Sequence, residues 1–495
     1  MSKKEVIIIG AGLGGLVAAI DLSCKGYKVT VIEKNNKPGG KIDKLKYEDF
    51  IVEPGPSCLL NPSVLKDLFD FAGEDFSDYV NLKKIDPELK GFFTDGKKLN
   101  FYNDPVNTKN NNIYLSQMNK NNLNRYFKYS EDIYDLIEEA FFEKGLDKPQ
   151  EVLSYFGIFK TFRGLDMFST LDDTITRFFS NYYLQELLKF FSNYAGSSPY
   201  RAPAAFSIYS FLQYEYGLWY PEGGFYNIII ALFQLAKKLE VKFIFNQRVK
   251  DLEVKNNNIK SVSTAKGEKY EGDFIVSNME VIPFYQQITD EDDEFMSNFS
   301  KYEPSASAII IFLVIKGDYK KLKMHNIFFT KESKEFYKTI FEDYKLPDDP
   351  SIHLLKTNSF NNKNYSKEFT TLKITVQVPY IQRNNKLKSE DYIEFKNKII
   401  DKLEWMGMDD LKERILFEKT FMPSDFASKY FANRGAIYGV VGDRDKNQGT
   451  SINKNSEKYE NLFFVGGSVN PGSSIPMVIT GARLVSEKLD SKHQN

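Results

Sequence analysis

The chain has 495 residues, of which 42% are hydrophobic and 15% aromatic, and its formal net charge is −1. This length exceeds what one simple core needs, so we expect two domains, or one nucleotide-binding domain with large insertions. A net charge so close to zero gives no field that attracts nucleic acid, and we expect no nucleic-acid partner. The aromatic excess has two explanations, which are a compositional bias of the source organism and an apolar tunnel or membrane-facing surface.

Cysteine usage and the N-terminus point to the cytosol. Cys24 and Cys58 form no CxxC pair, so the sequence predicts no metal site and no disulfide framework. The N-terminal MSKKEVIIIG leads directly into a strand and lacks the regions of a signal peptide. Since no apolar run reaches about eighteen residues, we expect no spanning helix, whereas attachment to a membrane surface stays open.

The first residues have the pattern of a βαβ unit. Residues 5–9 (EVIII) predict a buried strand, residues 16–26 a helix that ends on Gly26, and residues 27–33 a second buried strand. A glycine-rich turn separates the first strand from the helix, and an acidic residue, Glu33, ends the second strand. This context is typical of a dinucleotide-binding motif.

Each residue of that motif has a physical role in binding a dinucleotide. Gly10 permits a tight turn, Gly12 lets the backbone approach a pyrophosphate, and Gly15 lets the helix pack closely on the strand. Gly14 lies in the same turn, where the helix N-terminus offers free N–H groups and a positive dipole to phosphates. Glu33 is placed to accept hydrogen bonds from ribose hydroxyl groups.

The segments that follow distinguish FAD from NAD. Residues 38–41 read PGGK and residues 53–57 read EPGPS. This order is similar to that of many flavoproteins, in which such a stretch follows the second strand and wraps the nucleotide. The resemblance implies FAD, with a basic side chain against the pyrophosphate or ribityl chain. The contacts it implies are Gly39, Gly40, Lys41, Gly55, Pro56 and Ser57.

The rest of the chain alternates between helical and strand patterns. Residues 103–124 are rich in Asn and Lys and predict an exposed insertion or loop. Residues 125–220 are strongly aromatic and predict helices, and a glycine turn from Glu222 opens another helix. Several strands follow up to residue 278, then a mixed region from about 290 to 455. A final buried strand near 461–467 and a helix over 476–489 complete the chain.

Three further stretches resemble the bacterial phytoene desaturase family of carotenoid desaturases. They are GLWYPEGG at 217–224, PSDF at 423–426 with RGAIYG at 434–439, and NLFFVGGSVNPGSSIP at 461–476. With the N-terminal motif, their order and spacing match the family along the whole chain. The resemblance implies an α/β fold, in which a Rossmann-like FAD-binding domain carries an inserted α+β substrate domain, as in amine oxidases.

The resemblance also implies where the domains lie. Residues 1–100, 222–290 and 455–495 are expected to form the FAD-binding domain. Residues 101–221 and 291–454 are expected to form the domain that faces substrate and membrane. We expect a cytoplasmic protein attached peripherally to the inner face of the cell membrane.

The C-terminal stretch is expected to close over the isoalloxazine ring and ribityl chain. The family resemblance places Gly466, Gly467, Ile475 and Pro476 there, and Val249 at the nucleotide. Pro476 suits the first turn of a helix.

The chain also departs from the family. Many relatives carry Arg in place of Lys41, Asp near Glu53 and His in place of Asn470. The asparagine indicates a branch distinct from the best-known phytoene desaturases.

The implied activity is FAD-dependent desaturation of an acyclic carotenoid precursor, either a phytoene-like C40 or a diapophytoene-like C30 polyene. Its channel is expected among the aromatic residues 178–219. We assign no catalytic base, because His325, His353 and His493 lie outside every motif and are expected to be structural or exposed.

Asp425 and Arg434 lie inside family motifs and are expected to form a structural salt bridge. The alternatives are that they hold the loops near the flavin or touch an intermediate. Carotenoid isomerisation, saturation and oxygenation of a terminal methyl group remain alternatives on the same scaffold. A prenyl-binding escort protein without redox chemistry is the non-enzyme alternative. The PGSSIP stretch disfavours an amine oxidase.

Overall fold

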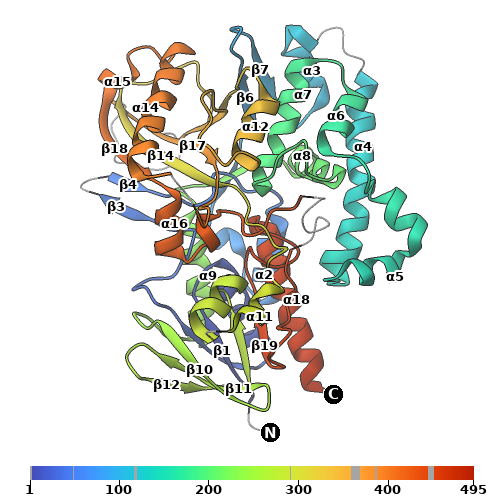
Figure 1. The fold of residues 1–495 in the computed structure, drawn as a ribbon, viewed down its shortest axis with the longest axis vertical. Coiled ribbons are helices and arrows are strands. Elements are labelled where there is room, and N and C mark those ends of the chain that lie inside the picture. The colour runs from blue at the N-terminus through green and yellow to red at the C-terminus, as the bar shows by residue number, and fades with distance from the viewer. Residues whose placement is uncertain are drawn as a thin grey trace.

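The fold joins a nucleotide-binding part, which carries both termini, to a larger part built on a second sheet (Figure 1). The computed structural model describes residues 3–47, 50–115, 120–289, 291–357, 368–384, 387–443 and 451–494. Among these residues, none of the helices combines the length and hydrophobicity that crossing a bilayer requires.

A five-stranded parallel sheet forms the centre of the nucleotide-binding part. Its order is β19 (Leu462–Phe464), β13 (Phe274–Ser277), β1 (Glu5–Ile9), β2 (Lys28–Ile32) and β9 (Lys242–Ile244). The predicted βαβ unit is therefore present.

Both faces of this parallel sheet are covered, which explains why its strands are continuous apolar runs. On β1, Val6 and Ile8 belong to one hydrophobic cluster, whereas Ile7 and Ile9 belong to another. The helices packed in the first cluster include α1 (Leu13–Cys24), α2 (Ser63–Phe71), α9 (Tyr226–Lys238) and α18 (Ile475–Gln494). An antiparallel sheet of β10 (Val249–Lys255), β11 (Asn258–Thr264) and β12 (Lys269–Glu271) contributes to the second.

The second part is built on a seven-stranded sheet, called the large sheet below. Its order is β18 (Ile415–Phe421), β14 (Ser307–Lys316), β17 (Phe369–Val378), β16 (Ile352–Lys356), β15 (His325–Phe328), β6 (Leu89–Phe92) and β7 (Lys98–Phe101). The antiparallel pairing of β14 with β17 runs from Ser307 opposite Val378 to Lys316 opposite Phe369. Alternate residues of β14 face opposite sides, so that Ile309 packs with helix α14 (Ser389–Trp405) and Ile310 faces the other way.

The large sheet differs in one respect from the expected domain division. The expected boundary at residue 100 assigned strand β6 and most of strand β7 to the FAD-binding domain. They are instead the edge of the large sheet, because Asn326, Ile327 and Phe328 of β15 pair with β6 in parallel register. The chain thus enters the second part before residue 89.

The aromatic region after residue 120 is helical, as the sequence predicts. Its elements are α4 (Lys120–Ile137), η3 (Glu138–Glu143), α5 (Pro149–Phe159), η4 (Lys160–Gly164), α6 (Leu171–Phe178), α7 (Tyr182–Lys189), η5 (Phe190–Ala195), η6 (Ala204–Phe206) and α8 (Ser207–Tyr216). The remaining elements are β3 (Leu45–Tyr47), β4 (Phe50–Val52), η1 (Phe76–Asp78), β5 (Leu82–Lys84), η2 (Ile113–Leu115), β8 (Trp219–Pro221), α10 (Val281–Phe284), η7 (Tyr285–Thr289), α11 (Asp293–Ser297), α12 (Ser333–Phe341), α15 (Leu411–Arg414), α16 (Pro423–Tyr430) and η8 (Asn433–Gly435).

The Asn-rich segment predicted as a loop contains a short helix, α3 (Pro105–Asn110). Asp104 caps it by accepting a hydrogen bond of 2.8 Å from the backbone N–H of Val106, and Pro105 stands at its first position. Asn112 is buried and bonds the backbone of Asn100. The loop prediction is wrong for residues 105–110, because the Asp104 cap and Pro105 favour a helix in spite of the Asn-rich composition. Residues 116–119 lie outside the described residues.

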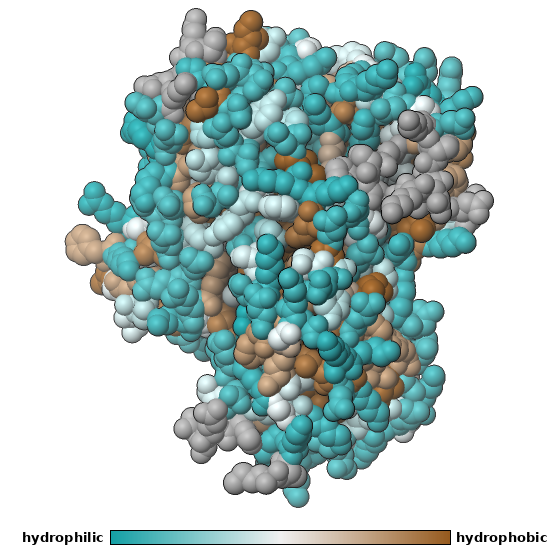
Figure 2. Space-filling model, turned by 180° about the vertical axis from the view of Figure 1, so that it is seen from behind, coloured by the Kyte–Doolittle hydropathy of each residue, from teal (hydrophilic) through white to brown (hydrophobic). Residues whose placement is uncertain are grey.

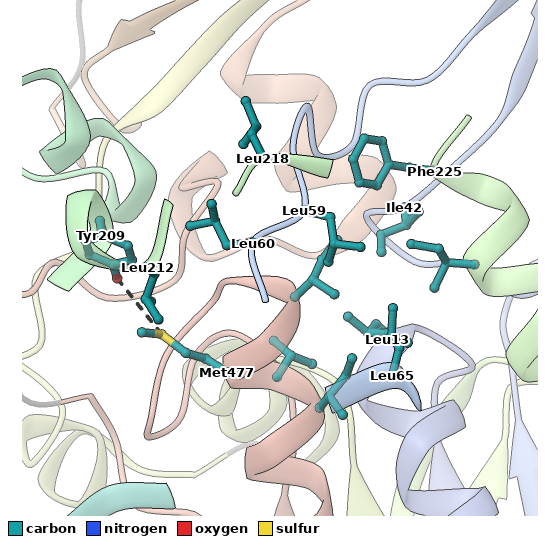
Figure 3. Packing of buried hydrophobic residues seen from close by; sticks show 14 of the residues in the cluster. Leu13, Ile42, Leu59, Leu60, Leu65, Tyr209, Leu212, Leu218, Phe225 and Met477 are labelled. Carbon is teal, nitrogen blue, oxygen red and sulfur yellow. Dashed lines mark hydrogen bonds between the residues drawn. The ribbon is translucent and has the colours of Figure 1, made fainter. Parts of the chain in front are cut away.

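One hydrophobic core spans both parts of the molecule (Figure 3). Leu13 and Leu65 come from the nucleotide-binding part, whereas Tyr209 comes from α8 of the helical region. The Tyr209 hydroxyl lies 4.0 Å from the Met477 sulfur at the start of α18. Because burial of each such side chain stabilises by about 1.5–3 kcal/mol, this shared core fixes the two parts against each other.

Candidate cofactor and substrate site

The glycine-rich turn after β1 brings the N-terminus of α1 to a cavity. Gly10 adopts φ +98°, a conformation that glycine reaches without strain. Gly12, Leu13 and Gly14 line the cavity. A side chain at Gly15 would collide with the carbonyl oxygen of Gly10, so this position must be small. The first turn of α1 therefore presents unpaired N–H groups to the cavity.

Glu33 supports the glycine turn from the end of β2. Its carboxylate accepts hydrogen bonds of 2.8 Å from the backbone N–H of Ala11 and from both the backbone and side chain of Asn35. Burial raises the pKa of Glu33, and those hydrogen bonds oppose the rise. Glu33 does not line the cavity described below, and its contact with a ribose stays a prediction.

Asn278, at the carboxyl end of β13, is a residue whose role the sequence did not reveal. Its backbone N–H donates to Ile9 (2.9 Å), which continues the strand pairing with β1. Its side chain lies against the glycine turn, since a Cβ at Gly12 would come 2.5 Å from Nδ2 and a Cβ at Gly14 would come 2.7 Å from Oδ1. Asn278 therefore places an amide at the glycine turn, where the phosphates are expected.

A cavity of about 320 Å³ lies where the glycine turn, the segment after β2, the C-terminal loop and the large sheet meet. Most of the residues predicted to contact FAD line it. They are Gly12, Gly14, Gly39, Gly40, Lys41, Gly55, Pro56, Ser57, Gly466, Gly467, Ile475 and Pro476. Gly10, Gly15, Glu33 and Val249 lie outside its wall, and Val249 packs instead in the cluster that contains Ile32.

Two charged residues of the predicted motifs are held by protein partners. The Lys41 ammonium pairs with Glu280 at 2.7 Å and approaches the carbonyl oxygen of Ile437 at 3.3 Å. Glu53 is partly buried and accepts a hydrogen bond from the backbone N–H of Phe225 (2.9 Å), so it caps α9. Lys41 thus joins three segments at the cavity wall, and Glu53 joins the EPGPS stretch to the PEGG turn.

The C-terminal loop lines the same cavity as the glycine turn, and its closure over the flavin stays a prediction. Gly466 follows β19 with φ +104°, and a Cβ at Gly14 would lie 3.0 Å from its nitrogen. Helix α18 begins at Ile475, so Pro476 stands in its first turn, where a missing N–H costs nothing. The two helix N-termini of α1 and α18 both border the cavity.

The opposite side of the cavity is lined by side chains from the large sheet, which no motif indicated. Lys373, Thr375 and Gln377 alternate along β17 and point into the cavity, and His353 does so from β16. From the aromatic segment 178–219, the residues Phe190, Asn193, Tyr194 and Tyr209 also line it. Polar alternation along β17 could have indicated a strand with one polar face, but not that this face lines a cavity.

His353, which was expected to be structural or exposed, faces the cavity. It lines the cavity, and its Nε2 lies 3.1 Å from Nδ1 of the fully buried His325. Burial lowers the pKa of His353 to about 4 and that of His325 well below its usual value. The pair is therefore neutral at pH 7. The side chain of His493 lies outside the described residues.

Lys373 is a buried cation beside this pair. Its ammonium donates to the backbone carbonyl oxygens of Gly55 and Pro56. Burial lowers the pKa of Lys373 to about 8, while nearby Glu53 and Cys58 act in the opposite direction. Lys373 thus links the large sheet to the predicted FAD-binding segment.

Asn470, Asp425 and Arg434 have structural partners. Asn470 bonds the backbone of Asp147 (2.8 Å) and of Ser451 (3.0 Å) and is buried. Asp425 caps α16 through the N–H of Met422.

Arg434 donates to the carbonyl oxygen of Ile381 (2.6 Å) and stacks on Tyr380. Since the carboxylate of Asp425 and the guanidinium of Arg434 bind elsewhere, the salt bridge expected between them is wrong.

The nucleotide side of the cavity fits a dinucleotide. The glycines leave the backbone N–H groups accessible to phosphates, and the N-terminus of α1 faces the same cavity. The buried carboxylate of Glu33 stabilises the glycine turn by accepting the N–H of Ala11. Among the residues that the structure describes, no group of three His, Cys, Asp or Glu side chains is arranged to hold a metal ion. FAD, when bound, supplies two-electron oxidation of C–H bonds.

Comparison with known proteins agrees with this geometry. The family model described as flavin containing amine oxidoreductase matches residues 13–489. The chain is 38% identical over 492 residues to the 4,4'-diaponeurosporene oxygenase of Staphylococcus haemolyticus (strain JCSC1435), covering 99% of this chain and 98% of that protein. It is 36% identical over 490 residues to the oxygenase of the same name from Staphylococcus aureus (strain MRSA252), covering 99% and 98%.

A solved structure shows the same fold. An oxidoreductase from Methanosarcina mazei superimposes with a TM-score of 0.64 at 16% identity, covering 98% of this chain and 100% of that one. The match of the family model and the full-length relatives together establish the family. The chain therefore belongs to the flavin-containing amine oxidoreductases, and it is an FAD-dependent oxidoreductase with a Rossmann-like FAD-binding domain and an inserted α+β domain.

Proposed function

We propose that this protein oxygenates a terminal methyl group of an acyclic C30 carotenoid, using FAD. The observation that carries the proposal is full-length similarity to two proteins named 4,4'-diaponeurosporene oxygenase. Conversion of a methyl group to an aldehyde consumes one dioxygen and releases one water, so dioxygen is the required co-substrate. Desaturation, the activity implied by the motifs, is the second candidate.

The cavity supports a reaction on the end of a hydrophobic chain. Its apolar walls include Phe190, Phe336 and Ile310, which suit a polyene. Polar side chains of the large sheet stand in the same cavity, and an oxygenated group is the part of such a ligand that they would bind. For desaturation, the second candidate, removal of a hydride from an allylic carbon leaves a delocalised cation, and the neighbouring proton is then lost without a strong protein base.

Product analysis tests the proposal directly. The protein is expressed in bacteria that make an acyclic C30 polyene hydrocarbon, and in bacteria that make the colourless C30 or C40 precursor. We expect the hydrocarbon to gain a terminal oxygen, detected as a mass increase with label from ¹⁸O₂. If the colourless precursor instead gains double bonds and no oxygen is incorporated, desaturation is the activity.

We further propose that the protein docks on a bilayer surface from the cytoplasmic side. Five exposed apolar residues project from α5, η4 and the turn after η4, and we call them the apolar tip. They are Tyr155, Ile158, Phe159, Phe162 and Phe168. Phe159 is 85% and Phe168 75% exposed, which is unusual for side chains of this size. Figure 2 shows apolar side chains projecting at the left-hand edge, where α5 lies in that view.

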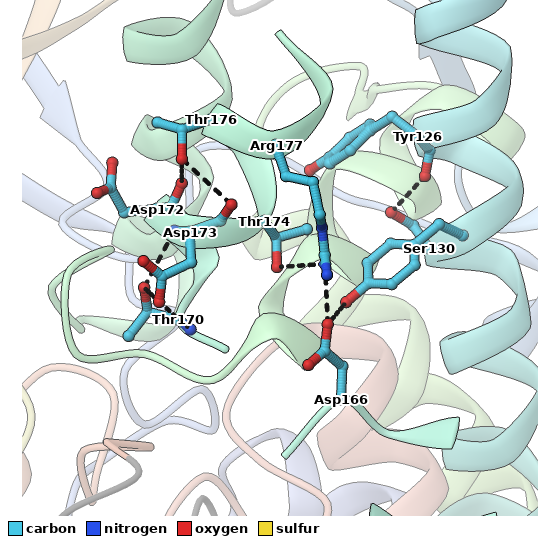
Figure 4. A network of polar contacts seen from close by, with 10 residues as sticks. Tyr126, Ser130, Asp166, Thr170, Asp172, Asp173, Thr174, Thr176 and Arg177 are labelled. Carbon is cyan, nitrogen blue, oxygen red and sulfur yellow. Dashed lines mark hydrogen bonds and ion pairs between the residues drawn. The ribbon is translucent and has the colours of Figure 1, made fainter. Parts of the chain in front are cut away.

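A polar network holds the base of the apolar tip in place (Figure 4). Asp166 accepts hydrogen bonds from Arg177 (2.9 Å) and from the hydroxyl of Tyr129 (2.6 Å). These contacts tie the turn that carries Phe168 to helices α4 and α6. The rings of Phe162 and Phe168 stack at 5.8 Å, so the turn presents them together. A rigidly held apolar projection supports shallow insertion into lipid.

A further inference from the structure

The side of the cavity that faces the large sheet is polar in a way that a hydrocarbon does not require. Four side chains of β16, β17 and the residue before β16 line it, and we call them the polar wall. They are Ser351, His353, Thr375 and Gln377. On β17 the intervening residues Ile374 and Val376 pack into the core on the opposite face of the sheet. The alternation therefore sends polar groups into the cavity and apolar groups into the core.

Gln377 is the least satisfied member of the polar wall. The residue is 6% exposed, and its Oε1 has no hydrogen-bond partner among the described residues. Its Nε2 lies 3.5 Å from the carbonyl oxygen of Asn193, which is a long contact. Buried amides are normally paired, because an unpaired polar atom loses its hydration without compensation. The amide thus offers a donor and an acceptor to a ligand in the cavity.

A pure hydrocarbon that filled this end of the cavity would leave those groups facing methyl and methylene carbons. A hydroxyl or carbonyl oxygen on the chain end would pair with them instead. Thr375 lies directly opposite His353 in the strand register, so these two hydrogen-bonding groups and Gln377 line one region of the cavity. The arrangement therefore favours a ligand with oxygen at one end of an apolar chain.

We propose that the polar wall is a binding subsite for the oxygenated end of the carotenoid, so that the enzyme retains the terminal alcohol for a second oxidation. This inference rests on the proposed terminal oxygenation. The subsite would bind the terminal alcohol more tightly than the parent hydrocarbon. Gln377 and Thr375 are the residues that would distinguish the alcohol from the hydrocarbon.

Equilibrium binding to the FAD-loaded protein tests the subsite without turnover. The flavin is kept reduced under argon, so it accepts no hydride, and binding is followed by the absorption shift of the polyene. The probes are an acyclic C30 polyene hydrocarbon and its terminal primary alcohol, both delivered in detergent micelles. We expect the wild-type protein to bind the alcohol about tenfold more tightly, which is the effect of one good hydrogen bond.

Two substitutions of similar shape remove the polar groups separately. Gln377→Leu and Thr375→Val are each expected to reduce the preference for the alcohol several-fold and to leave hydrocarbon affinity unchanged or increased. Thr420→Val is the matched control, because Thr420 lies on β18 of the same large sheet and does not line the cavity, and its buried Oγ1 has no partner in the part of the chain that the structure describes. It is expected to retain the full preference. Flavin content and thermal melting confirm that each variant is folded.

The outcomes separate the subsite from the proposed function. Equal affinity of the wild-type protein for both probes, or an unchanged preference in folded Gln377→Leu and Thr375→Val, would overturn the subsite while the proposed function stands. If the wild-type protein binds neither probe, the proposed function fails and the subsite fails with it. Loss of the preference in both variants but not in Thr420→Val supports the subsite.

Discussion

The side chain of Asn278 lies directly against Gly12, where an added Cβ would come 2.5 Å from Nδ2 of the amide. This contact gives Gly12 a second reason to be small, beside the approach of a phosphate to the backbone. The asparagine comes from β13 and the glycine from the turn after β1, and these strands are adjacent and parallel. A side chain at position 12 therefore disturbs both the turn and the amide beside it.

The first prediction is that Gly12→Val yields protein without FAD. Valine would displace Asn278 and cover the first N–H groups of α1, which are the expected phosphate ligands. Flavin absorbance relative to total protein measures the effect after purification. We expect less than about a tenth of the wild-type flavin content, since two or three charge-assisted hydrogen bonds of about 1.5–3 kcal/mol each are lost.

A control substitution at another glycine separates loss of FAD binding from a general loss of folding. Gly267 has φ +84°, and no atom of the described residues lies within 4 Å of an added Cβ, so Gly267→Asn is expected to keep full flavin content. Stoichiometric FAD in folded Gly12→Val would refute the placement of the pyrophosphate at this turn.

The βαβ unit and its glycine turn were predictable because their signals are local. Gly10, Gly12 and Glu33 lie within one βαβ unit, where turn geometry, helix polarity and strand burial all follow from neighbouring residues. Asn278 was not predicted, although its strand was. Its position against the glycines depends on the register of β1 with β13, which are far apart in the chain.

The substrate side of the site was not predictable for the same physical reason. Lys373, Thr375 and Gln377 alternate with Ile374 and Val376, and such alternation ordinarily indicates a strand with one face in solvent. The fold instead turns that face toward the nucleotide-binding part and encloses it. Long-range packing of two domains decides whether the polar face meets water or a cavity, and no local pattern carries that information.

The second prediction concerns the buried charge of Lys373. Its pKa is about 8 in the folded protein and about 10.4 in an unfolded chain, so the unfolded state binds more protons between these values. The free energy of unfolding therefore gains a contribution as pH rises from 8 to about 10.4. Below pH 8 the buried charge costs up to about 3 kcal/mol, and Lys373→Met removes that cost.

Urea denaturation at several pH values measures this contribution. We expect Lys373→Met to be more stable than wild type at pH 7, with a difference that shrinks as pH approaches 10. Lys419→Met on β18 serves as the control, because Lys419 is partly exposed and is expected to change stability by less than about 0.5 kcal/mol. A variant less stable than wild type at pH 7 would show that the bonds to Gly55 and Pro56 outweigh burial.

The third prediction concerns the neutral pair His325 and His353. Burial depresses the pKa of both rings in the folded protein, and for His353 the value is about 4. An unfolded histidine binds its proton near pH 6.5, so this stabilisation is present above about pH 6.5 and is lost as pH falls toward 4. The slope amounts to about 1.4 kcal/mol per pH unit for each proton.

Replacing both rings by phenylalanine tests the third prediction, because the flat shape is kept and the protonation is removed. We expect the double variant to lose less free energy of unfolding than wild type between pH 7 and pH 4.5. Comparison of the two proteins cancels the titration of carboxylates, which they share. An identical acid dependence would mean that the rings take up protons in the folded state.

The fourth prediction concerns the apolar tip and its contact with lipid. Ile158→Ser, Phe159→Ser and Phe168→Ser together remove three side chains that are 68%, 85% and 75% exposed. Burial of each such group in lipid stabilises by about 1.5–3 kcal/mol, so the triple variant is expected to bind vesicles at least tenfold more weakly. Flotation with phosphatidylglycerol vesicles and with phosphatidylcholine vesicles measures the bound fraction. The loss should appear with both lipids, because insertion of apolar side chains does not require charge.

A control on another surface makes this prediction specific to the tip. Ile393 and Leu416 are 48% and 52% exposed and belong to α14 and β18, which lie across the molecule from α5 (Figure 1). Ile393→Ser with Leu416→Ser removes similar apolar surface there and is expected to leave vesicle binding unchanged. Flavin content should match wild type in both variants, because neither surface lines the cavity. Equal vesicle binding by the wild-type protein, the triple variant and the control variant would mean that lipid contacts another surface. If the wild-type protein binds neither lipid, the proposal of membrane docking is wrong.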